Sequence, residues 1–231
     1  MFLVGGPAFC GTTLLAHLLN QEDIVCLDEP DFHNPEQNHR GILVLETLFP
    51  DRDFPARPEK KLSYPDAYRF ITRCQEIVQP VRLGMKTANW SFIRYARQYR
   101  KSGYPVIAII RDIRDTLVTP LPEWTSERDL NKAYRLIWKN RKLYDYWCRY
   151  EDLVMNPEDI MAEISRTLQE NIELKRSWNA EQVHPGMVKL ERHRLLEQGS
   201  IKTSRVGLWK NSGKIFHRTS HRTAIMMGYH E

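Results

Sequence analysis

The first residues of the chain that could do chemistry form a glycine-bounded loop near the N-terminus. Residues 2–4 (FLV) are apolar, and residues 5–15 (GGPAFCGTTLL) follow them directly. This order predicts a β-strand, a tight loop and the first turn of a helix. Such a loop directs backbone N–H groups and the positive end of a helix dipole to one point, which is how proteins hold phosphate groups. The chemistry expected here is the binding of a phosphorylated ligand.

The spacing of this loop from Gly6 onward is that of a Walker A sequence with one substitution. Thr12 stands where the lysine that binds the β- and γ-phosphates of ATP is expected. We therefore expect the loop to bind a phosphate, but not those phosphates of ATP.

Charged side chains lie at the ends of three further expected strands. Asp28 and Glu29 follow residues 24–27, Lys86 ends the strand of residues 81–85, and Arg111 follows residues 106–110. Strands that alternate with helices form a parallel sheet with right-handed crossovers, and ligands bind beyond the carboxyl ends of its strands. An anion-binding loop, a carboxylate, a lysine and an arginine are therefore expected at the same edge.

The elements that position these residues follow from hydrophobic periodicity and capping residues. Helices are expected over residues 12–20, 66–78, 90–101, 126–144 and 156–168, and a last strand over residues 146–150. Residues 28–40 are expected to be loop, residues 42–49 are an apolar run of uncertain type, and residues 51–65 form a long excursion that could be a lid and shape an acceptor site. Beyond residue 171 the pattern weakens. The expected fold class is α/β, a P-loop-type three-layer domain with a central parallel sheet of about five strands flanked by helices.

The composition suits one soluble globular domain. The 231 residues are 42% hydrophobic and 27% charged, which is enough apolar content for a sizeable core. Lysine and arginine exceed aspartate and glutamate by 34 − 29 = 5, and this modest surplus favours anionic ligands. No decisive basic patch is visible, so nucleic acid is not an expected partner.

The four cysteines and the apolar segments indicate the cellular compartment in which the protein is expected. No cysteine pair has C-x-x-C spacing, so no zinc site is expected, and reduced thiols in a cytoplasmic protein are the natural interpretation. No segment approaches the ~20 apolar residues that span a bilayer, and no cationic region of a signal peptide precedes the first apolar run. Membrane association is therefore not expected.

Together these residues resemble the PAPS-dependent sulfotransferases, which move a sulfuryl group from 3′-phosphoadenosine 5′-phosphosulfate (PAPS) to an acceptor. The family's first loop, P-[KR]-[ST]-G-T-T-x-L, wraps the 5′-phosphosulfate, and residues 8–15 are similar to it, with a proline one place early. The second motif, R-[DN]-P-x-x-R-x-x-S, holds the 3′-phosphate through its first arginine and last serine. Arg111 and Thr119 have the same spacing, 119 − 111 = 8, with Ile113 in place of the proline.

Further segments are similar to the family in the same order. Residues 149–153 (RYEDL) and 156–158 (NPE) resemble two of them, and residues 202–211 (KTSRVGLWKN) resemble the late R-K-G-x-x-G-D-W-K-N segment that closes over the cofactor. Residues 27–32 (LDEPDF) are similar to K-E-P-H-F-F of the glucosaminyl 3-O-sulfotransferases, whose glutamate is the catalytic base. Residues 85–90 (MKTANW) resemble E-K-T-P-S-Y, whose lysine lies beside the transferring group.

The resemblance implies a single sulfotransferase-like domain over residues 1–231. It would transfer sulfuryl from PAPS to a hydroxyl or amine of a small-molecule or carbohydrate acceptor, leave adenosine 3′,5′-bisphosphate, and require no metal. Glu29 would take the acceptor's proton, and Lys86 would neutralise charge on the leaving 5′-phosphate. The implied cofactor-binding residues are Pro7, Ala8, Phe9, Cys10, Gly11, Thr12, Thr13, Leu14, Arg111, Thr119, Lys202, Ser204, Arg205, Gly207 and Trp209.

Phe9 is the departure from the family pattern, because it aligns with the loop lysine or arginine. Losing such a cation costs on the order of a few kcal/mol of transition-state stabilisation. Either Lys86 or a later basic residue compensates, or activity is weak, or the chain binds the nucleotide without turnover. A non-catalytic nucleotide-binding protein and a P-loop kinase stay open as alternatives, although a kinase should carry the loop lysine that Thr12 replaces.

Two other side chains have more than one interpretation. Cys10 lies at the start of a helix, where a thiol can become reactive, but we expect it to stand in for a serine. Trp209 is expected to pack in the core, with stacking on adenine as the alternative. Residues 150–152 (YED) are expected to be structural.

Overall fold

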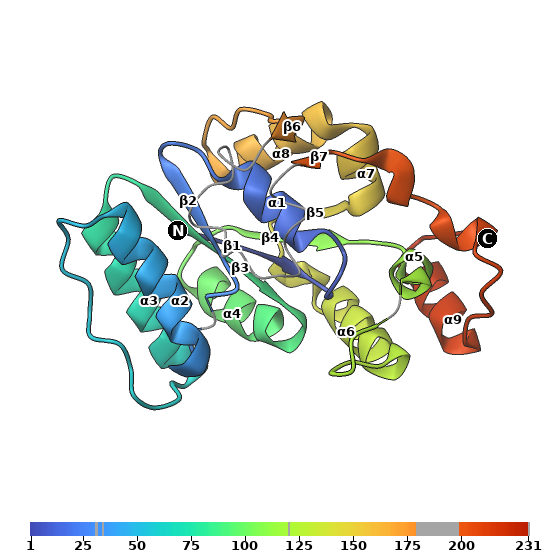
Figure 1. The fold of residues 1–231 in the computed structure, drawn as a ribbon, viewed down its shortest axis with the longest axis horizontal. Helices are drawn as coiled ribbons and strands as arrows, with labels where there is room; N and C mark the ends of the chain where they lie inside the picture. Colours follow the sequence, from blue (N-terminus) through green and yellow to red (C-terminus); the bar gives the residue numbers. More distant parts are fainter. Residues whose placement is uncertain (31, 34, 120, 179–198, 231) are drawn as a thin grey trace.

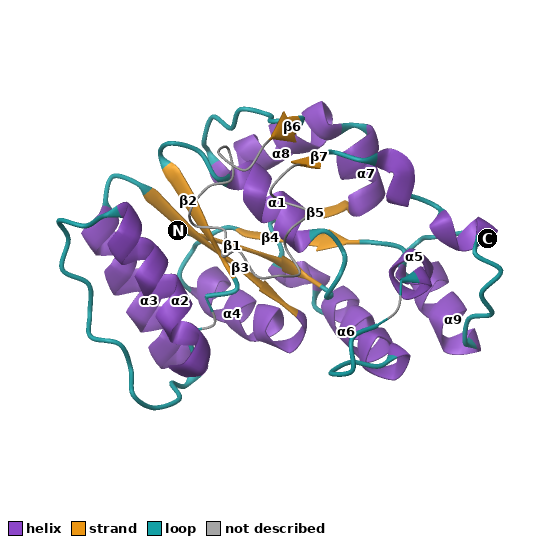
Figure 2. Ribbon diagram, in the orientation of Figure 1, coloured by secondary structure: helices purple, strands orange, loops and turns teal. Residues whose placement is uncertain are grey.

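Five parallel strands form the centre of the molecule (Figure 2). The structure is a computed structural model that describes residues 1–30, 32–33, 35–119, 121–178 and 199–230. The sheet order is β2-β3-β1-β4-β5, and every pair is parallel. The strands are β1 (Phe2–Gly6), β2 (Ile24–Asp28), β3 (Arg82–Ala88), β4 (Val106–Ile110) and β5 (Tyr146–Arg149). The expected α/β class with a five-stranded parallel sheet is confirmed.

Helices cover both faces of this sheet (Figure 1). One face carries α1 (Thr12–Leu19), α7 (Tyr150–Met155), α8 (Pro157–Leu168) and a small antiparallel ribbon of β6 (Ser177–Trp178) and β7 (Gly199–Ser200). The other face carries α2 (Pro35–Leu48), α3 (Tyr64–Val78), α4 (Asn89–Lys101), α5 (Ile113–Val118), α6 (Glu127–Lys139) and α9 (Arg218–Met226). The three-layer arrangement expected from the sequence is therefore present.

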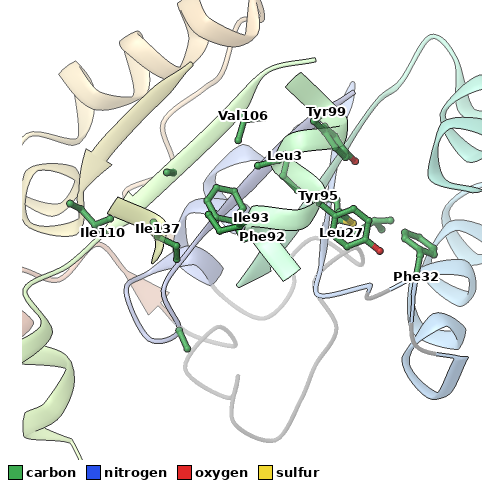
Figure 3. Close-up of a cluster of buried hydrophobic side chains, with 14 of the residues drawn as sticks. Leu3, Leu27, Phe32, Phe92, Ile93, Tyr95, Tyr99, Val106, Ile110 and Ile137 are labelled. Carbon is green, nitrogen blue, oxygen red and sulfur yellow. The ribbon is translucent and has the colours of Figure 1, made fainter. Parts of the chain in front are cut away.

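The apolar runs of the strands are explained by burial on both faces. Along β1, Leu3 points into the core beneath α3, α4 and α6, whereas Phe2 and Val4 point into the core beneath α1 and α8. Alternating side chains of a strand lie on opposite faces, so a strand covered on both sides must be apolar throughout. Figure 3 shows the first of these cores, which contains Leu3 of β1 together with Phe92 and Tyr95 of α4.

Several expected boundaries were wrong, and proline explains the largest error. Helix α2 begins at Pro35, inside the segment expected to be loop, and it includes most of the apolar run 42–49. Proline is compatible with the first turn of a helix, so Pro35 starts this helix and does not exclude it. Strand β3 continues to Ala88, so Lys86 lies within the strand and not at its end. Helix α6 ends at Lys139, and a 3₁₀ turn follows over Arg141–Leu143.

The region past residue 171 contains structure that the sequence pattern did not predict. Its described elements are the β6–β7 ribbon, two 3₁₀ turns (Thr203–Arg205 and Leu208–Asn211) and helix α9. Residues 179–198 lie outside the described residues, as does Asp31 of the segment 27–32. Residues 51–63 run as an extended connection between α2 and α3. Arg57 in this connection forms an ion pair with Glu46 of α2.

The cysteines are free thiols, as the sequence predicted. All four cysteines are buried free thiols, so no disulfide is present. Within the described parts of the chain, no helix combines the length and apolar character needed to cross a membrane. Ser126 caps α6, as expected, because its hydroxyl accepts a hydrogen bond from the Asp129 N–H at 3.2 Å.

Candidate active site

A cavity of about 410 Å³ lies beyond the carboxyl ends of the central strands. Its wall is built by the loop after β1, the ends of β2 and β3, the segment after β4, and the chain that follows β7. Predicted site residues that line the cavity are Ala8, Phe9, Gly11, Thr12, Thr13, Leu14, Glu29, Lys86, Arg111, Thr119, Lys202 and Arg205. The parallel sheet thus brings together residues that are up to 197 positions apart in the sequence (205 − 8 = 197).

Other predicted residues are not among those that line the cavity. These are Pro7, Cys10, Ser204, Gly207 and Trp209. The wall also contains residues that the sequence did not single out as ligand contacts, namely Ala88, Thr116, Leu121, Trp124, Tyr150, Trp178 and Ser200. No described residue between 51 and 65 lines this cavity, and the part of this excursion in an acceptor site stays a prediction.

The loop after β1 leaves the first turn of α1 open toward the cavity. Gly11 precedes the helix with a φ of 93°, a left-handed conformation that glycine adopts without strain. A Cβ atom at Gly11 would lie 2.5 Å from Tyr150 Cδ2, so the close approach of Tyr150 also requires glycine. No described side chain caps α1. Its first backbone N–H groups are therefore available to an anionic ligand, as the sequence predicted.

The Cys10 side chain holds this loop through contacts with two backbone carbonyl oxygens. Its Sγ atom donates to Pro7 O at 2.7 Å and lies 3.0 Å from Ile109 O. Burial raises the pKa of the Cys10 thiol far above its usual range, so the group is neutral. This environment agrees with the expected serine-like role and not with a reactive thiol.

Lys86 is the centre of a charged cluster on β2 and β3. Its Nζ atom is 2.8 Å from Asp28 Oδ1 and 2.9 Å from Glu29 Oε1. Burial lowers the pKa of Lys86, but the two carboxylates raise it by more, so the ammonium stays charged. The Asp28 side chain is fully buried, whereas 34% of the Glu29 side chain is exposed. Glu29 is therefore the carboxylate of this cluster that a ligand in the cavity can contact.

Strained backbone gathers at the ends of three neighbouring strands. Phe9, Glu29 and Asn89 have φ values of 66°, 47° and 54°, in the left-handed region that non-glycine residues rarely adopt. They follow β1, β2 and β3, and Asn89 Oδ1 accepts a hydrogen bond from the Ala8 N–H at 2.9 Å. Strained residues of this kind cluster at functional sites, where the surrounding structure holds them in place.

Arg111 lies deep in the cavity wall with one donor unused. Its guanidinium stacks on the Tyr150 ring at 4.7 Å, and its Nη2 donates to Arg205 O. The buried Nε has no hydrogen-bond partner among the described residues. A buried, charged donor without a partner is costly, so this position fits an anionic group bound in the cavity.

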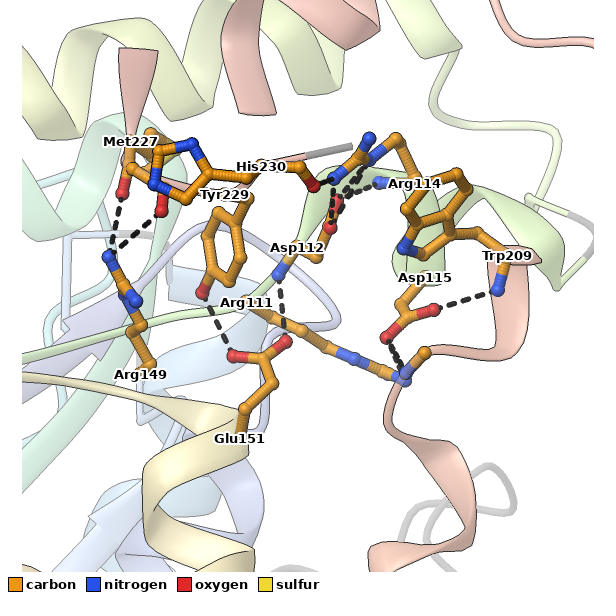
Figure 4. Close-up of polar contacts among 12 residues, drawn as sticks. Arg111, Asp112, Arg114, Asp115, Arg149, Glu151, Trp209, Met227, Tyr229 and His230 are labelled. Carbon is orange, nitrogen blue, oxygen red and sulfur yellow. Dashed lines mark hydrogen bonds and ion pairs between the residues drawn. The ribbon is translucent and has the colours of Figure 1, made fainter. Parts of the chain in front are cut away.

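Asp115 of α5 forms hydrogen bonds with the late segment, residues 202–211, and holds it near Arg111 (Figure 4). Its carboxylate accepts hydrogen bonds from the Gly207 N–H at 2.7 Å and the Trp209 N–H at 2.9 Å. The Trp209 ring packs against the Arg114 guanidinium at 3.7 Å. This packing agrees with the structural role expected for Trp209, and the late segment holds Lys202 and Arg205 in the cavity wall.

Removing the Asp115 carboxylate should loosen this segment. In Asp115→Ala, two hydrogen bonds to backbone N–H groups are lost, each worth about 0.5–1.5 kcal/mol. We expect hydrogen exchange at Gly207 and Trp209 to accelerate about tenfold or more. Asp129→Ala, which removes an exposed carboxylate on α6, is the control. Unchanged exchange at Gly207 and Trp209 would show that Asp115 does not hold the segment.

Residues 149–153 (RYEDL) form hydrogen bonds with the C-terminal residues 228 and 229, as Figure 4 shows. Glu151 accepts hydrogen bonds from the Asp112 N–H at 3.0 Å and from the Tyr229 hydroxyl at 2.9 Å. Arg149 Nη2 donates to Gly228 O at 3.2 Å. These contacts agree with the structural role expected for this segment, although Tyr150 also lines the cavity.

Within the described residues, no group of three or more His, Cys, Asp or Glu side chains could hold a metal ion.

The strand order and the open loop define an α/β domain of P-loop type, and comparison with solved structures gives its fold. The chain is similar to the sulfotransferase domain of the Synechococcus PCC 7002 olefin synthase, with a TM-score of 0.53 and 12% identity over 100% of this chain and 95% of that domain. It is also matched to mouse sulfotransferase SULT7A1 complexed with PAP, with a TM-score of 0.46 and 14% identity over 96% of this chain and 79% of the mouse chain. No family model and no curated protein matches the sequence. The chain therefore has the sulfotransferase fold.

Proposed function

We propose that the protein is a PAPS-dependent sulfotransferase that acts on a hydroxyl or amine of a small-molecule or carbohydrate acceptor. The observation that carries the proposal is one cavity, on a sulfotransferase fold, that joins an open phosphate loop, a buried arginine and a carboxylate–lysine pair. PAPS would supply the sulfuryl group. We place the reaction in the cytoplasm, because the four cysteines are free thiols.

The negative charges of PAPS match the N–H donors and cationic side chains that line the cavity. The open N–H groups of residues 11–13 would hold the 5′-phosphosulfate. Arg111, through its unpaired Nε, and the Thr119 hydroxyl would hold the 3′-phosphate. Lys202 and Arg205 would add positive charge from the late segment.

Glu29 and Lys86 would carry the proton and charge chemistry. Glu29 is the exposed carboxylate of its cluster, so it would accept the proton of the acceptor hydroxyl. Asp28 is buried and shares the charge of Lys86, which leaves Glu29 less tightly bound to the ammonium. The ammonium has three donors, and two contact Asp28 and Glu29. The third would stabilise negative charge that grows on the leaving 5′-phosphate.

A non-catalytic nucleotide-binding protein is the second candidate, and Phe9 favours it. The phenyl ring stands where the family has a loop cation, and it stacks on Trp124. The proposal assigns the missing charge to Lys86, Lys202 and Arg205. A P-loop kinase is disfavoured by Thr12, which replaces the lysine that such a site uses for ATP.

Transfer of radiolabelled sulfate from PAPS to a panel of phenol, alcohol, amine and sugar acceptors tests the proposal. We expect labelled product with at least one class of acceptor, formed in the presence of EDTA. Tight binding of adenosine 3′,5′-bisphosphate without transfer to any class would favour the non-catalytic alternative. Phosphate transfer from ATP would support the kinase.

A further inference from the structure

Helices α4, α6 and α9 each carry a line of exposed lysine and arginine side chains. Within each helix these side chains follow one another at intervals of three or four residues, which places them along one side of the helix. We call this set the cationic face. Its members are Arg94, Arg97 and Lys101 of α4, Arg128, Lys132, Arg135 and Lys139 of α6, and Arg218 and Arg222 of α9.

The three lines of cations belong to one side of the molecule. Helix α6 contacts both α4 and α9, and all three helices lie on the same side of the sheet (Figure 1). The side of each helix opposite its cations is buried in the same core, as Phe92 and Ala96 of α4, Tyr134 and Ile137 of α6, and Ala224 of α9 show. The exposed cations therefore point away from the sheet into solvent.

The positive charge of the protein is concentrated in these helices and the residues beside them. Residues 89–101, 127–142 and 214–226 contain 13 lysine and arginine residues but two acidic ones, a net charge of 13 − 2 = +11. The whole chain has a net charge of +5, so its other residues have 5 − 11 = −6. Of these 13 cations, two have an acidic partner among the described residues, Arg100 and Lys132. A solvated helix face usually mixes both signs, so this separation indicates a surface for an anionic partner.

Exposed apolar side chains accompany the cations on α4 and α9. Trp90 lies four residues before Arg94 on α4 and is 54% exposed, and Ile225 lies three residues after Arg222 on α9 and is 51% exposed. Ile215, just before α9, is 95% exposed. The phosphates of a nucleic acid would give these apolar groups no partner. The interface of a lipid bilayer accepts tryptophan and aliphatic side chains together with lysine and arginine.

We propose that the cationic face docks the protein on a lipid bilayer that contains anionic phospholipids. Each lysine or arginine held near such a surface strengthens binding by about fivefold. The apolar sides of the helices are buried in the core, so the face binds at the level of the headgroups, a mode that needs no spanning helix. The negative charge of the other residues turns the face toward the bilayer. This inference does not depend on the proposed sulfotransferase function.

Flotation with lipid vesicles tests the proposal. The wild-type protein is mixed with vesicles of phosphatidylcholine alone or of equal parts of phosphatidylcholine and phosphatidylglycerol. Each mixture is measured in about 0.1 M and about 1 M sodium chloride, between which the screening length falls from about 10 Å to about 3 Å. Two double variants remove cations from different helices, Arg94→Gln with Arg97→Gln and Arg128→Gln with Lys139→Gln. Because they alter separate helices, the proposal is tested even if one of them does not fold.

Two further variants serve as a matched control and as a test of the apolar contribution. Arg166→Gln with Arg176→Gln removes the same charge from two exposed arginines that lie outside the cationic face and pair with glutamates. Ile225→Ser with Met226→Ser keeps every cation but removes exposed apolar groups of α9. None of the substituted residues lines the cavity, so all variants should bind adenosine 3′,5′-bisphosphate as the wild type does.

The expected result is binding to the anionic vesicles alone, lost in about 1 M salt. Each double variant of the cationic face should bind about 10- to 25-fold more weakly, and the serine variant about five- to tenfold more weakly, while the arginine control stays within about twofold of the wild type. Absence of binding, equal binding to both kinds of vesicle, or an equal loss in the control would overturn the proposal.

A competition with nucleic acid separates the two kinds of anionic surface. Duplex DNA is added to the wild type on anionic vesicles, at a concentration of phosphate groups equal to that of the anionic lipid. The protein should stay on the vesicles, because DNA offers no apolar interface to Trp90 and Ile225. Release of the protein by DNA would assign the cationic face to nucleic acid and overturn the proposal. The assay contains no nucleotide substrate, so its result stands whether or not the protein binds the bisphosphate.

Discussion

Arg111→Ala should weaken the binding of adenosine 3′,5′-bisphosphate far more than that of adenosine 5′-monophosphate, which lacks the 3′-phosphate. The buried guanidinium has an unpaired Nε that would donate to the 3′-phosphate. A hydrogen bond from a charged group contributes about 1.5–3 kcal/mol, so the bisphosphate should lose about 10- to 150-fold in affinity. Titration calorimetry of both nucleotides measures the difference.

Arg111 also supports the late segment, and a control must separate the two roles. Its Nη2 donates to Arg205 O, so alanine could loosen residues 203–211. Asp115→Ala loosens the same segment while Arg111 remains, and it should weaken both nucleotides by similar factors. If Arg111→Ala likewise weakens both nucleotides equally, the guanidinium does not recognise the 3′-phosphate.

Glu29→Gln should abolish most sulfate transfer while the bisphosphate still binds. The amide cannot accept the acceptor's proton, and general base catalysis contributes about 10²- to 10⁴-fold. The amide is close to the carboxylate in size and can keep a contact with Lys86, which also stays bound to Asp28. Steady-state rates and calorimetry on the same preparation measure the two properties.

Asp28→Asn is the matched control for the base. It removes the other carboxylate that contacts Lys86, at 2.8 Å from its Nζ, but leaves Glu29 in the cavity wall. The loss of transfer should be smaller than in Glu29→Gln. If Glu29→Gln turns over at the wild-type rate, another group takes the proton and the assignment of Glu29 is wrong.

The part of the site that follows the strands could be predicted from the sequence. Residues 106–110 are a continuous apolar run, and such a run is buried on both faces of a parallel sheet, which fixes the position of Arg111. The loop before α1 could also be predicted, because Gly11 has a positive φ that glycine adopts more readily than other residues. A parallel sheet then aligns the carboxyl ends of its strands, so Glu29, Lys86 and Arg111 meet without any need to predict side-chain packing.

The remaining parts of the site depend on contacts that leave no local pattern. Strands β6 and β7 have two residues each, too few to show a period of two, yet they place Trp178 and Ser200 in the cavity wall. Trp124 enters the cavity wall from a segment after α5 that has no periodicity, and it stacks on Phe9. The contact of Asp115 with Gly207 joins residues 92 positions apart. Such contacts require the folded chain.

Calorimetric titration of the wild-type protein with adenosine 3′,5′-bisphosphate in EDTA tests whether the cavity binds the nucleotide of PAPS. We expect binding without any divalent cation, about tenfold or more tighter than that of ATP with Mg²⁺, because the cavity offers N–H groups, Arg111 and Lys86 but no loop lysine at Thr12. Binding of ATP with Mg²⁺ in preference to the bisphosphate would contradict it.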